Sequence, residues 1–170
     1  CRLAARHAFE LDCNWKIAME ANTEVYHVKS IHPTTVAPIL DDRRNVNSLY
    51  PNGHHRMVAP RPPGTTSTLQ QQRSNLPEID SVGEIARTCT QSYGIFPNWV
   101  SPLSAVALPP LLFWPCGINR CILETWTLAP AWGDLDKPDL WTENDGEQLV
   151  QVLREDTEFG AWIQKSVESY

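Results

Sequence analysis

The first residues of the chain change from a strand pattern to a helical one. Residues 1–12, CRLAARHAFELD, alternate loosely between apolar and polar side chains, which predicts a β-strand. Residues 14–27, NWKIAMEANTEVYH, have apolar positions three or four apart, which predicts a helix. Asp12 or Asn14 can cap that helix, because a short polar side chain accepts hydrogen bonds from the first free backbone N–H groups.

The middle of the chain lacks a regular pattern and is followed by strands. Residues 33–77 are rich in Pro, Gly, Ser, Thr and Gln, so we expect irregular structure there, with 51–77 as a long loop or partly ordered lid. A short helix is expected within 81–94. From Ile95 onward, aromatic and β-branched residues predict strands, with a hairpin turn at 116–119, CGIN.

Residues 142–169 predict a long helix whose apolar stripe contains one acidic residue, Asp156. A carboxylate on a core-facing stripe is costly unless it is paired or bound to a metal, so Asp156 is a candidate ligand. Asp145 is its competitor, but the helix dipole explains an acidic residue in a first turn. Glu155 and Glu158 are expected on the polar face, without a special role. The other stripe positions are Leu149, Val152, Phe159, Ile163 and Val167.

The order of the expected elements predicts the fold class, and the length and net charge limit the kinds of function. The order of strand, helix, irregular region, antiparallel strands and long C-terminal helix predicts an α+β domain with helices packed on an antiparallel sheet. The 170 residues suffice for one domain with a core. A net charge of −6 disfavours nucleic acid as a partner. We expect no membrane span and no signal peptide, because every long apolar run is interrupted by proline or polar residues.

The five cysteines are odd in number and scattered, which does not indicate a disulfide framework. Cys116 and Cys121 could supply half of a zinc site, but no second pair completes it. We therefore expect buried free thiols, a reducing environment and a cytoplasmic location.

His27, His32 and Asp156 together offer the two-histidine, one-carboxylate set that binds non-haem Fe(II) and leaves coordination positions open. We expect His27 on the last helical turn. Five residues rotate a straight helix by about 500°, so His32 can converge on the same point only if the helix breaks before Pro33. Glu24, three residues before His27, can accept a hydrogen bond from it. By spacing alone, two ordinary histidines at a helix end remain an alternative.

The other three histidines have a weaker context. His7 lies in the expected first strand, and His54 and His55 lie in the expected flexible loop beside Arg56. We expect all three to be structural or exposed to solvent.

Motifs at both ends and in the middle resemble the catalytic domain of Rieske-type aromatic ring-hydroxylating oxygenases, in the large (alpha) subunit. Residues 14–32, NWKIAMEANTEVYHVKSIH, resemble the family's Asn-Trp-Lys start, its acidic residue before a Tyr-His pair, and its second His five residues later. Residues 95–98, IFPN, resemble its strand-start motif. Residues 152–169, VLREDTEFGAWIQKSVES, resemble its closing Glu-Asp helix with a Gln eight residues after the Asp.

The resemblance implies a helix-grip, START-like fold in which residues 1–170 form the catalytic mononuclear-iron domain. It implies that His27, His32 and Asp156 bind Fe(II). Glu24 would be the carboxylate that bridges this iron to the Rieske [2Fe–2S] cluster of a neighbouring subunit. Candidates for hydrogen bonds around the site are Asn22, Tyr26 and Gln164.

The chain departs from the family's pattern in three places. Ala21 follows Glu20 where the family usually has Asn, and Ala161 stands where relatives often have an acidic residue. The Cys-x-His and Cys-x-x-His pairs that bind a Rieske cluster are absent from the sequence. We therefore expect the electron-donating domain upstream of Cys1.

The implied function is activation of O₂ at Fe(II) to hydroxylate or dihydroxylate an aromatic or related small organic substrate. Dioxygenation, monooxygenation and demethylation are all compatible with the resemblance. It implies a reductase or ferredoxin as electron donor and a homotrimer or α3β3 assembly of the parent protein. From the net charge and the apolar runs we expect no nucleic-acid or membrane partner. Apolar candidates for the pocket or the core are Trp99, Val106, Leu108, Leu112, Phe113 and Trp126.

Three alternatives stay open. A metal-free helix-grip module could carry a small hydrophobic ligand. A zinc hydrolase could use the same three residues with Glu24 as its general base. A domain of this kind could also serve assembly alone.

Overall fold

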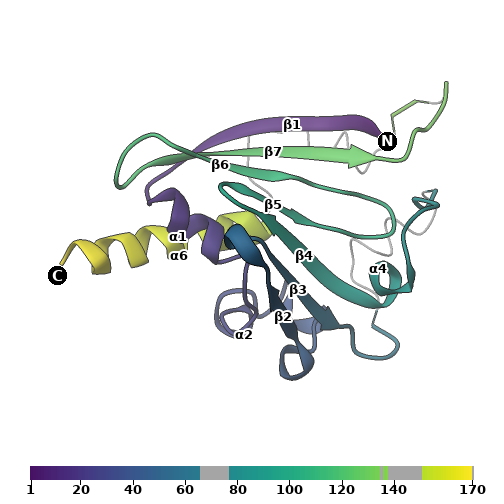
Figure 1. The fold of residues 1–170 in the computed structure, drawn as a ribbon, viewed down its shortest axis with the longest axis horizontal. Coiled ribbons are helices and arrows are strands. Elements are labelled where there is room, and N and C mark those ends of the chain that lie inside the picture. Colours follow the sequence, from purple (N-terminus) through teal and green to yellow (C-terminus); the bar gives the residue numbers. More distant parts are fainter. Residues whose placement is uncertain (66–76, 135, 138–150, 170) are drawn as a thin grey trace.

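The computed structural model describes residues 1–65, 77–134, 136–137 and 151–169. Seven strands form one antiparallel sheet in the order β1-β7-β6-β5-β4-β3-β2, and helices pack against it, so the predicted α+β class is confirmed (Figure 1). The strands are β1 Arg2–Leu11, β2 Val46–Leu49, β3 His55–Pro60, β4 Cys89–Ile95, β5 Trp99–Pro102, β6 Leu111–Pro115 and β7 Cys121–Ala129.

Strands β1, β7 and β6 form one side of the sheet, with β1 at its edge. β1 pairs with β7 from Arg2 opposite Ala129 to Leu11 opposite Cys121. β6 and β7 form a hairpin that closes at Pro115 opposite Cys121, which confirms the turn predicted at 116–119. The chain therefore leaves β1 beside this hairpin and enters the helical layer there.

Helices α1, α2 and α6 lie together, and α4 lies at the opposite end of the sheet (Figure 1). α6 contacts both α1 and α2, and its C-terminal end extends beyond the sheet. Among the described residues, none of the helices has an apolar stretch of the length that crossing a bilayer demands. The helices are α1 Trp15–Glu20, α2 Val28–Ile31, α4 Glu84–Thr88 and α6 Gln151–Glu168, with 3₁₀ turns η1 Ala37–Ile39, η2 Asp42–Arg44 and η3 Pro51–Gly53.

Two hydrophobic clusters fix the helices on the sheet. The larger lies between α1 and strands β1, β5, β6 and β7, with Leu153 of α6 packed against it. The smaller joins the segment around α2 to β3 through Val28, Met57 and Ala59. Burial of this apolar area holds α2 and α6 in the positions from which the candidate site is built. The larger cluster comprises Leu11, Cys13, Met19, Val100, Leu111, Phe113, Cys121 and Leu123.

The helix predicted over 14–27 is shorter than expected. α1 ends at Glu20, and the chain turns before α2 begins at Val28. The Glu24 carboxylate accepts the backbone N–H groups of Tyr26 and His27, at 2.6 and 3.3 Å. A side chain that captures nearby backbone donors competes with the helical hydrogen bonds and ends the helix. The predicted cap is confirmed, because the Asn14 side chain accepts the N–H of Lys16.

The prediction of irregular structure over 33–77 is wrong for two segments. β2 and β3 lie within it, at the edge of the sheet, and β4 begins at Cys89 rather than at Ile95. β3 is only six residues long, and its alternation of buried and half-buried positions starts with a histidine, which hid the pattern. The part of the expected loop at 66–76 lies outside the described residues.

The C-terminal helix is confirmed over its described length, but its packing face differs from the predicted stripe. Gly160 and Gln164 are its buried positions, whereas Val167 is 58% exposed. A Cβ atom at Gly160 would lie 3.3 Å from the Cys13 sulfur, so glycine lets α6 approach closely there. Asp156 therefore lies beside the packing face. Residues 138–150, with Asp145 and Leu149, lie outside the described part of the chain.

Candidate metal centre

The two ends of α2 carry the two predicted histidines. His27 is the N-cap of this four-residue helix and His32 is its C-cap. His32 has φ −117° and ψ 46°, outside the helical region, as the following proline predicts. The two rings lie 5.2 Å apart between centroids, at 72° to each other. The prediction that His27 lies on the last turn of a long helix is therefore wrong. The predicted break before Pro33 is confirmed, and it brings the two rings together.

Asp156 reaches both histidines from α6. Its Oδ1 lies 2.8 Å from Nε2 of His32 and 3.6 Å from Nε2 of His27. One ligand atom from each of the three residues lies within 4.8 Å of the other two. Within the described residues, this is the one group of three or more His, Cys, Asp or Glu side chains so arranged.

Each histidine also has a carboxylate at its other nitrogen. Nδ1 of His27 bonds Oε1 of Glu24, and Nδ1 of His32 lies 2.7 Å from Oε2 of Glu155. Such partners fix the ring orientation and direct Nε2 to the centre, which is the usual support of metal-binding histidines. The prediction that Glu155 has no special role is therefore wrong. The sequence did not reveal this contact. Consecutive residues point about 100° apart on a helix, so Glu155 was not expected to face the same histidine as Asp156.

His32 is 2% exposed, and the two carboxylates beside its ring determine the direction of its pKa shift. Burial alone would lower the pKa of His32, but the hydrogen bonds and charges of Asp156 and Glu155 outweigh it and raise that pKa. Burial likewise acts to raise the pKa of Glu155, yet hydrogen bonds from His32, Thr35 and Gln151 lower it. The carboxylates of Glu24, Glu155 and Asp156 thus surround the two histidines with negative charge, as a cation site requires.

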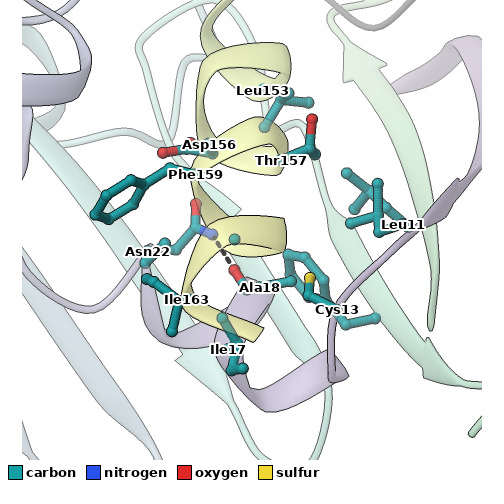
Figure 2. A pocket seen from close by; sticks show the side chains of 14 residues that line it. Leu11, Cys13, Ile17, Ala18, Asn22, Leu153, Asp156, Thr157, Phe159 and Ile163 are labelled. Atoms are coloured by element: carbon teal, nitrogen blue, oxygen red, sulfur yellow. Dashed lines mark hydrogen bonds between the residues drawn. The ribbon is translucent and has the colours of Figure 1, made fainter. Parts of the chain in front are cut away.

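Asn22, Tyr26 and Gln164, which were expected to form hydrogen bonds around the site, lie in three different environments. Asn22 adjoins Asp156 in a small cavity, and its amide donates to the Ala18 carbonyl (Figure 2). Tyr26 is 82% exposed and contributes its backbone N–H to Glu24 rather than its side chain. Gln164 accepts the Asn14 N–H at 2.8 Å, so it joins α6 to the start of α1 instead of supporting the three candidate ligands.

An apolar cavity of about 30 Å³ lies between α1, α6 and the sheet beside Asp156 (Figure 2). Leu153 and Thr157 point to one side of α6, and Asp156 and Phe159 point to the other. A cavity of this size holds one or two water-sized molecules, not an aromatic substrate. Phe113 is the one predicted pocket residue in its lining. Trp99 and Leu112 pair across strands next to the core pair Val100 and Leu111, so they lie on the opposite face.

The remaining histidines and cysteines lie apart from this group. His55 is buried in β3, so the flexible loop predicted for it is wrong. All five cysteines are free, and Cys121 is buried as expected, but Cys116 is exposed. The exposure of Cys116 contradicts the expected buried pair.

A known protein family matches the whole length of the chain. The family model described as "Ring hydroxylating alpha subunit (catalytic domain)" matches residues 1–170. A search of curated protein sequences found no match.

Solved structures with the same fold share little sequence with the chain. A quaternary ammonium Rieske monooxygenase, CntA, is 16% identical with a TM-score of 0.68 over 98% of this chain and 40% of its own. Dicamba monooxygenase bound to 3,6-dichlorosalicylic acid is 13% identical with a TM-score of 0.69, over 97% and 50%. Naphthalene 1,2-dioxygenase from Rhodococcus sp. bound to indole is 16% identical with a TM-score of 0.63, over 97% and 44%. The chain thus spans half or less of the length of these proteins.

Proposed function

Because the chain belongs to the family of ring-hydroxylating alpha-subunit catalytic domains, we propose that it is the oxygen-activating domain of a Rieske non-haem iron oxygenase. The observation that carries the proposal is the convergence of His27, His32 and Asp156, each with its ligand atom within 4.8 Å of the others. The helix-grip, START-like description of the fold is part of the same proposal, supported by the helices on one sheet and the likeness to dicamba monooxygenase.

The donor chemistry suits a mononuclear iron. Two neutral imidazole nitrogens and one carboxylate oxygen are the ligands of non-haem Fe(II) oxygenases, and they leave positions open for other molecules. Carboxylates at both Nδ1 atoms support this assignment, because they turn the two Nε2 atoms toward one point. When bound, the iron supplies an open coordination site at which O₂ is activated for reaction with an organic substrate.

The chain's own residues hold and screen that centre. Asp156 contributes the single negative charge among the three ligands and balances part of the metal's charge. The apolar lining of the neighbouring cavity, including Leu153 and Phe159, limits water beside Asp156. Low local polarity strengthens the electrostatic interactions of the charged groups that remain.

Glu24 is the residue we propose for electron entry. It lies behind His27, on the Nδ1 side, and its carboxylate is largely but not fully buried. An outward-lying carboxylate bonded to a ligand imidazole can join that ligand to a donor group on a neighbouring subunit. The donor would be a Rieske [2Fe–2S] cluster served by a reductase or ferredoxin, in a trimeric assembly of the whole protein.

The same contact argues against a zinc hydrolase. A general base must lie within hydrogen-bond reach of a metal-bound water, directly or through one other water. Glu24 instead uses one oxygen for His27 Nδ1 and the other for the backbone N–H groups of Tyr26 and His27. Its carboxylate therefore lies on the Nδ1 side of His27, away from the Nε2 side where a metal-bound water would be. The free cysteines support a reducing compartment, for which we propose the cytoplasm.

Iron–nitrosyl spectroscopy tests the function. The purified chain is loaded anaerobically with Fe(II), nitric oxide is added, and the electron paramagnetic resonance spectrum is recorded. We expect a high-spin iron–nitrosyl signal that is lost in His27→Ala and Asp156→Ala but kept in Glu158→Gln, an exposed change on the same helix. Absence of the signal in a folded parent would contradict the proposal and favour a metal-free ligand-binding module. Survival of the signal in both site variants would also contradict it, because other residues would then hold the iron.

A further inference from the structure

Glu155 supports His32 in a way that differs from the support of His27 by Glu24. Its Oε2 lies 2.7 Å from Nδ1 of His32, while Oδ1 of the adjacent Asp156 lies 2.8 Å from Nε2 of the same ring. Consecutive residues of α6 therefore hold the two nitrogens of one imidazole. Glu24 holds His27 from within its own loop, but Glu155 holds His32 from a distant segment of the chain.

The Glu155 carboxylate is itself held by two further donors. The Thr35 hydroxyl donates to Oε2 at 2.8 Å, and the Gln151 amide donates to Oε1 at 3.0 Å. Both oxygens are thus engaged, and the side chain is less than a quarter exposed. A carboxylate fixed by three donors has a defined orientation, which a mobile surface glutamate lacks.

The geometry points to Glu155 as a positioning residue of the metal centre. It accepts the Nδ1–H of His32, keeps the imidazole in the tautomer with a free Nε2, and ties the α2 ligand pair to the α6 ligand. It does not itself face the centre, because it lies on the Nδ1 side of the ring. This inference rests on the proposed function, since it needs His32 to be a ligand.

Co(II) affinity tests the inference in the full 170-residue chain. The metal dissociation constant is measured by titration for the parent, Glu155→Gln, Glu155→Ala and the matched control Glu158→Gln. We expect about 10–100-fold weaker Co(II) binding in Glu155→Ala, the range found for outer-shell partners of ligand histidines. Glu155→Gln should fall between Glu155→Ala and the parent, because its neutral amide oxygen still accepts a hydrogen bond but polarises the ring less.

A second readout separates positioning from general stability. The Fe(II)–nitrosyl spectrum of each variant is recorded beside its thermal unfolding curve. A positioning role predicts a changed rhombicity of the signal in Glu155→Gln even where the melting temperature equals that of the parent. Thr35→Val, which removes one donor to Glu155, should give a smaller change of the same kind and serves if Glu155→Ala fails to fold.

The outcomes distinguish the inference from its premise. If the parent binds Co(II), His32→Asn abolishes binding, and Glu155→Gln and Glu155→Ala bind like Glu158→Gln with unchanged spectra, the positioning role is overturned and the metal site stands. If the parent does not bind Co(II), or His32→Asn binds as tightly as the parent, the metal site is overturned and this inference with it.

Discussion

His32 and His55 are both buried histidines, 2% and 8% exposed, in opposite electrostatic surroundings. His32 has a carboxylate at each nitrogen, and these partners raise its pKa despite burial. For His55, burial lowers the pKa, and its Nε2 has no hydrogen-bond partner among the described residues. Burial therefore does not make a histidine a ligand candidate; the partners at its two nitrogens do.

The His55 ring packs closely against the neighbouring strand. A Cβ atom at Gly94, its cross-strand neighbour, would lie 1.8 Å from Cε1 of His55. Only a glycine leaves room for the ring against the strand at that point. His55 thus fills space between strands, whereas His32 organises charge between helices.

The largest expected effect tests whether the two histidine environments differ in metal binding. Asp156→Asn should weaken Co(II) binding by more than the roughly 10–100-fold that an outer partner contributes, because it removes the charged ligand itself. His55→Asn should leave the dissociation constant unchanged. Parallel titrations of the parent and the two variants measure this, and equal losses in both would erase the distinction.

Gly94→Ala should produce the next largest effect, on stability. The added methyl group would overlap the His55 ring, and overpacking of this kind costs about 1–3 kcal/mol or more. The cost should nearly vanish in a His55→Ala background, where the space is free. Urea unfolding of the two single variants and the double variant measures the coupling, and an equal cost in both backgrounds would show that the ring is not the obstacle.

Sequence patterns predicted the longest elements and missed the short ones. β1 and α6 have enough residues for their periodicity to stand out. β2 and β3 are four and six residues long. The pairing of β3 with β4, and of β2 with β3, rather than their own sequence pattern, makes them strands. The break after α1 was also hidden, because it depends on where the Glu24 side chain points.

The three proposed ligands could be selected from sequence, but their support could only partly be foreseen. Glu24 lies three residues from His27, so local spacing revealed their contact. Glu155 and His32 are 123 residues apart, and no local rule connects them. Gln164 was expected near the ligands and instead joins α6 to Asn14, because a motif conveys residue identity without direction.

A smaller loss of Co(II) affinity should measure how much the carboxylate at Nδ1 of His27 contributes to metal binding. Glu24→Gln should weaken Co(II) binding about 10-fold, the lower part of the range for outer partners, because an amide oxygen can still accept from His27 and cap the local backbone. Glu24→Ala should weaken it further. If both variants bind as the parent does, the carboxylate behind His27 is irrelevant to metal binding, and the contrast with His55 would rest on His32 alone.

The smallest expected effect is a difference in how stability depends on pH. Because burial lowers the His55 pKa in the folded chain, the unfolded chain takes up this proton more readily. Its contribution to stability is therefore fully present above the unfolded value of about 6.5 and is lost as the pH falls toward the folded value. His32 behaves oppositely in the metal-free chain: its raised pKa stabilises the fold below about pH 6.5, and that contribution is lost as the pH rises through the folded value.

The free energies of unfolding of the parent and His55→Asn, both in the presence of a chelator, isolate the His55 contribution. The difference between them should shift against the parent as the pH is lowered from about 7.5 to about 5.5, since only the parent must protonate His55 on acid unfolding. All other groups, including His32 and the carboxylates around it, are common to both proteins and cancel. A difference that stays constant over this range would mean that His55 is solvated in the folded chain. The pKa values of the two buried histidines would then not shift in opposite directions.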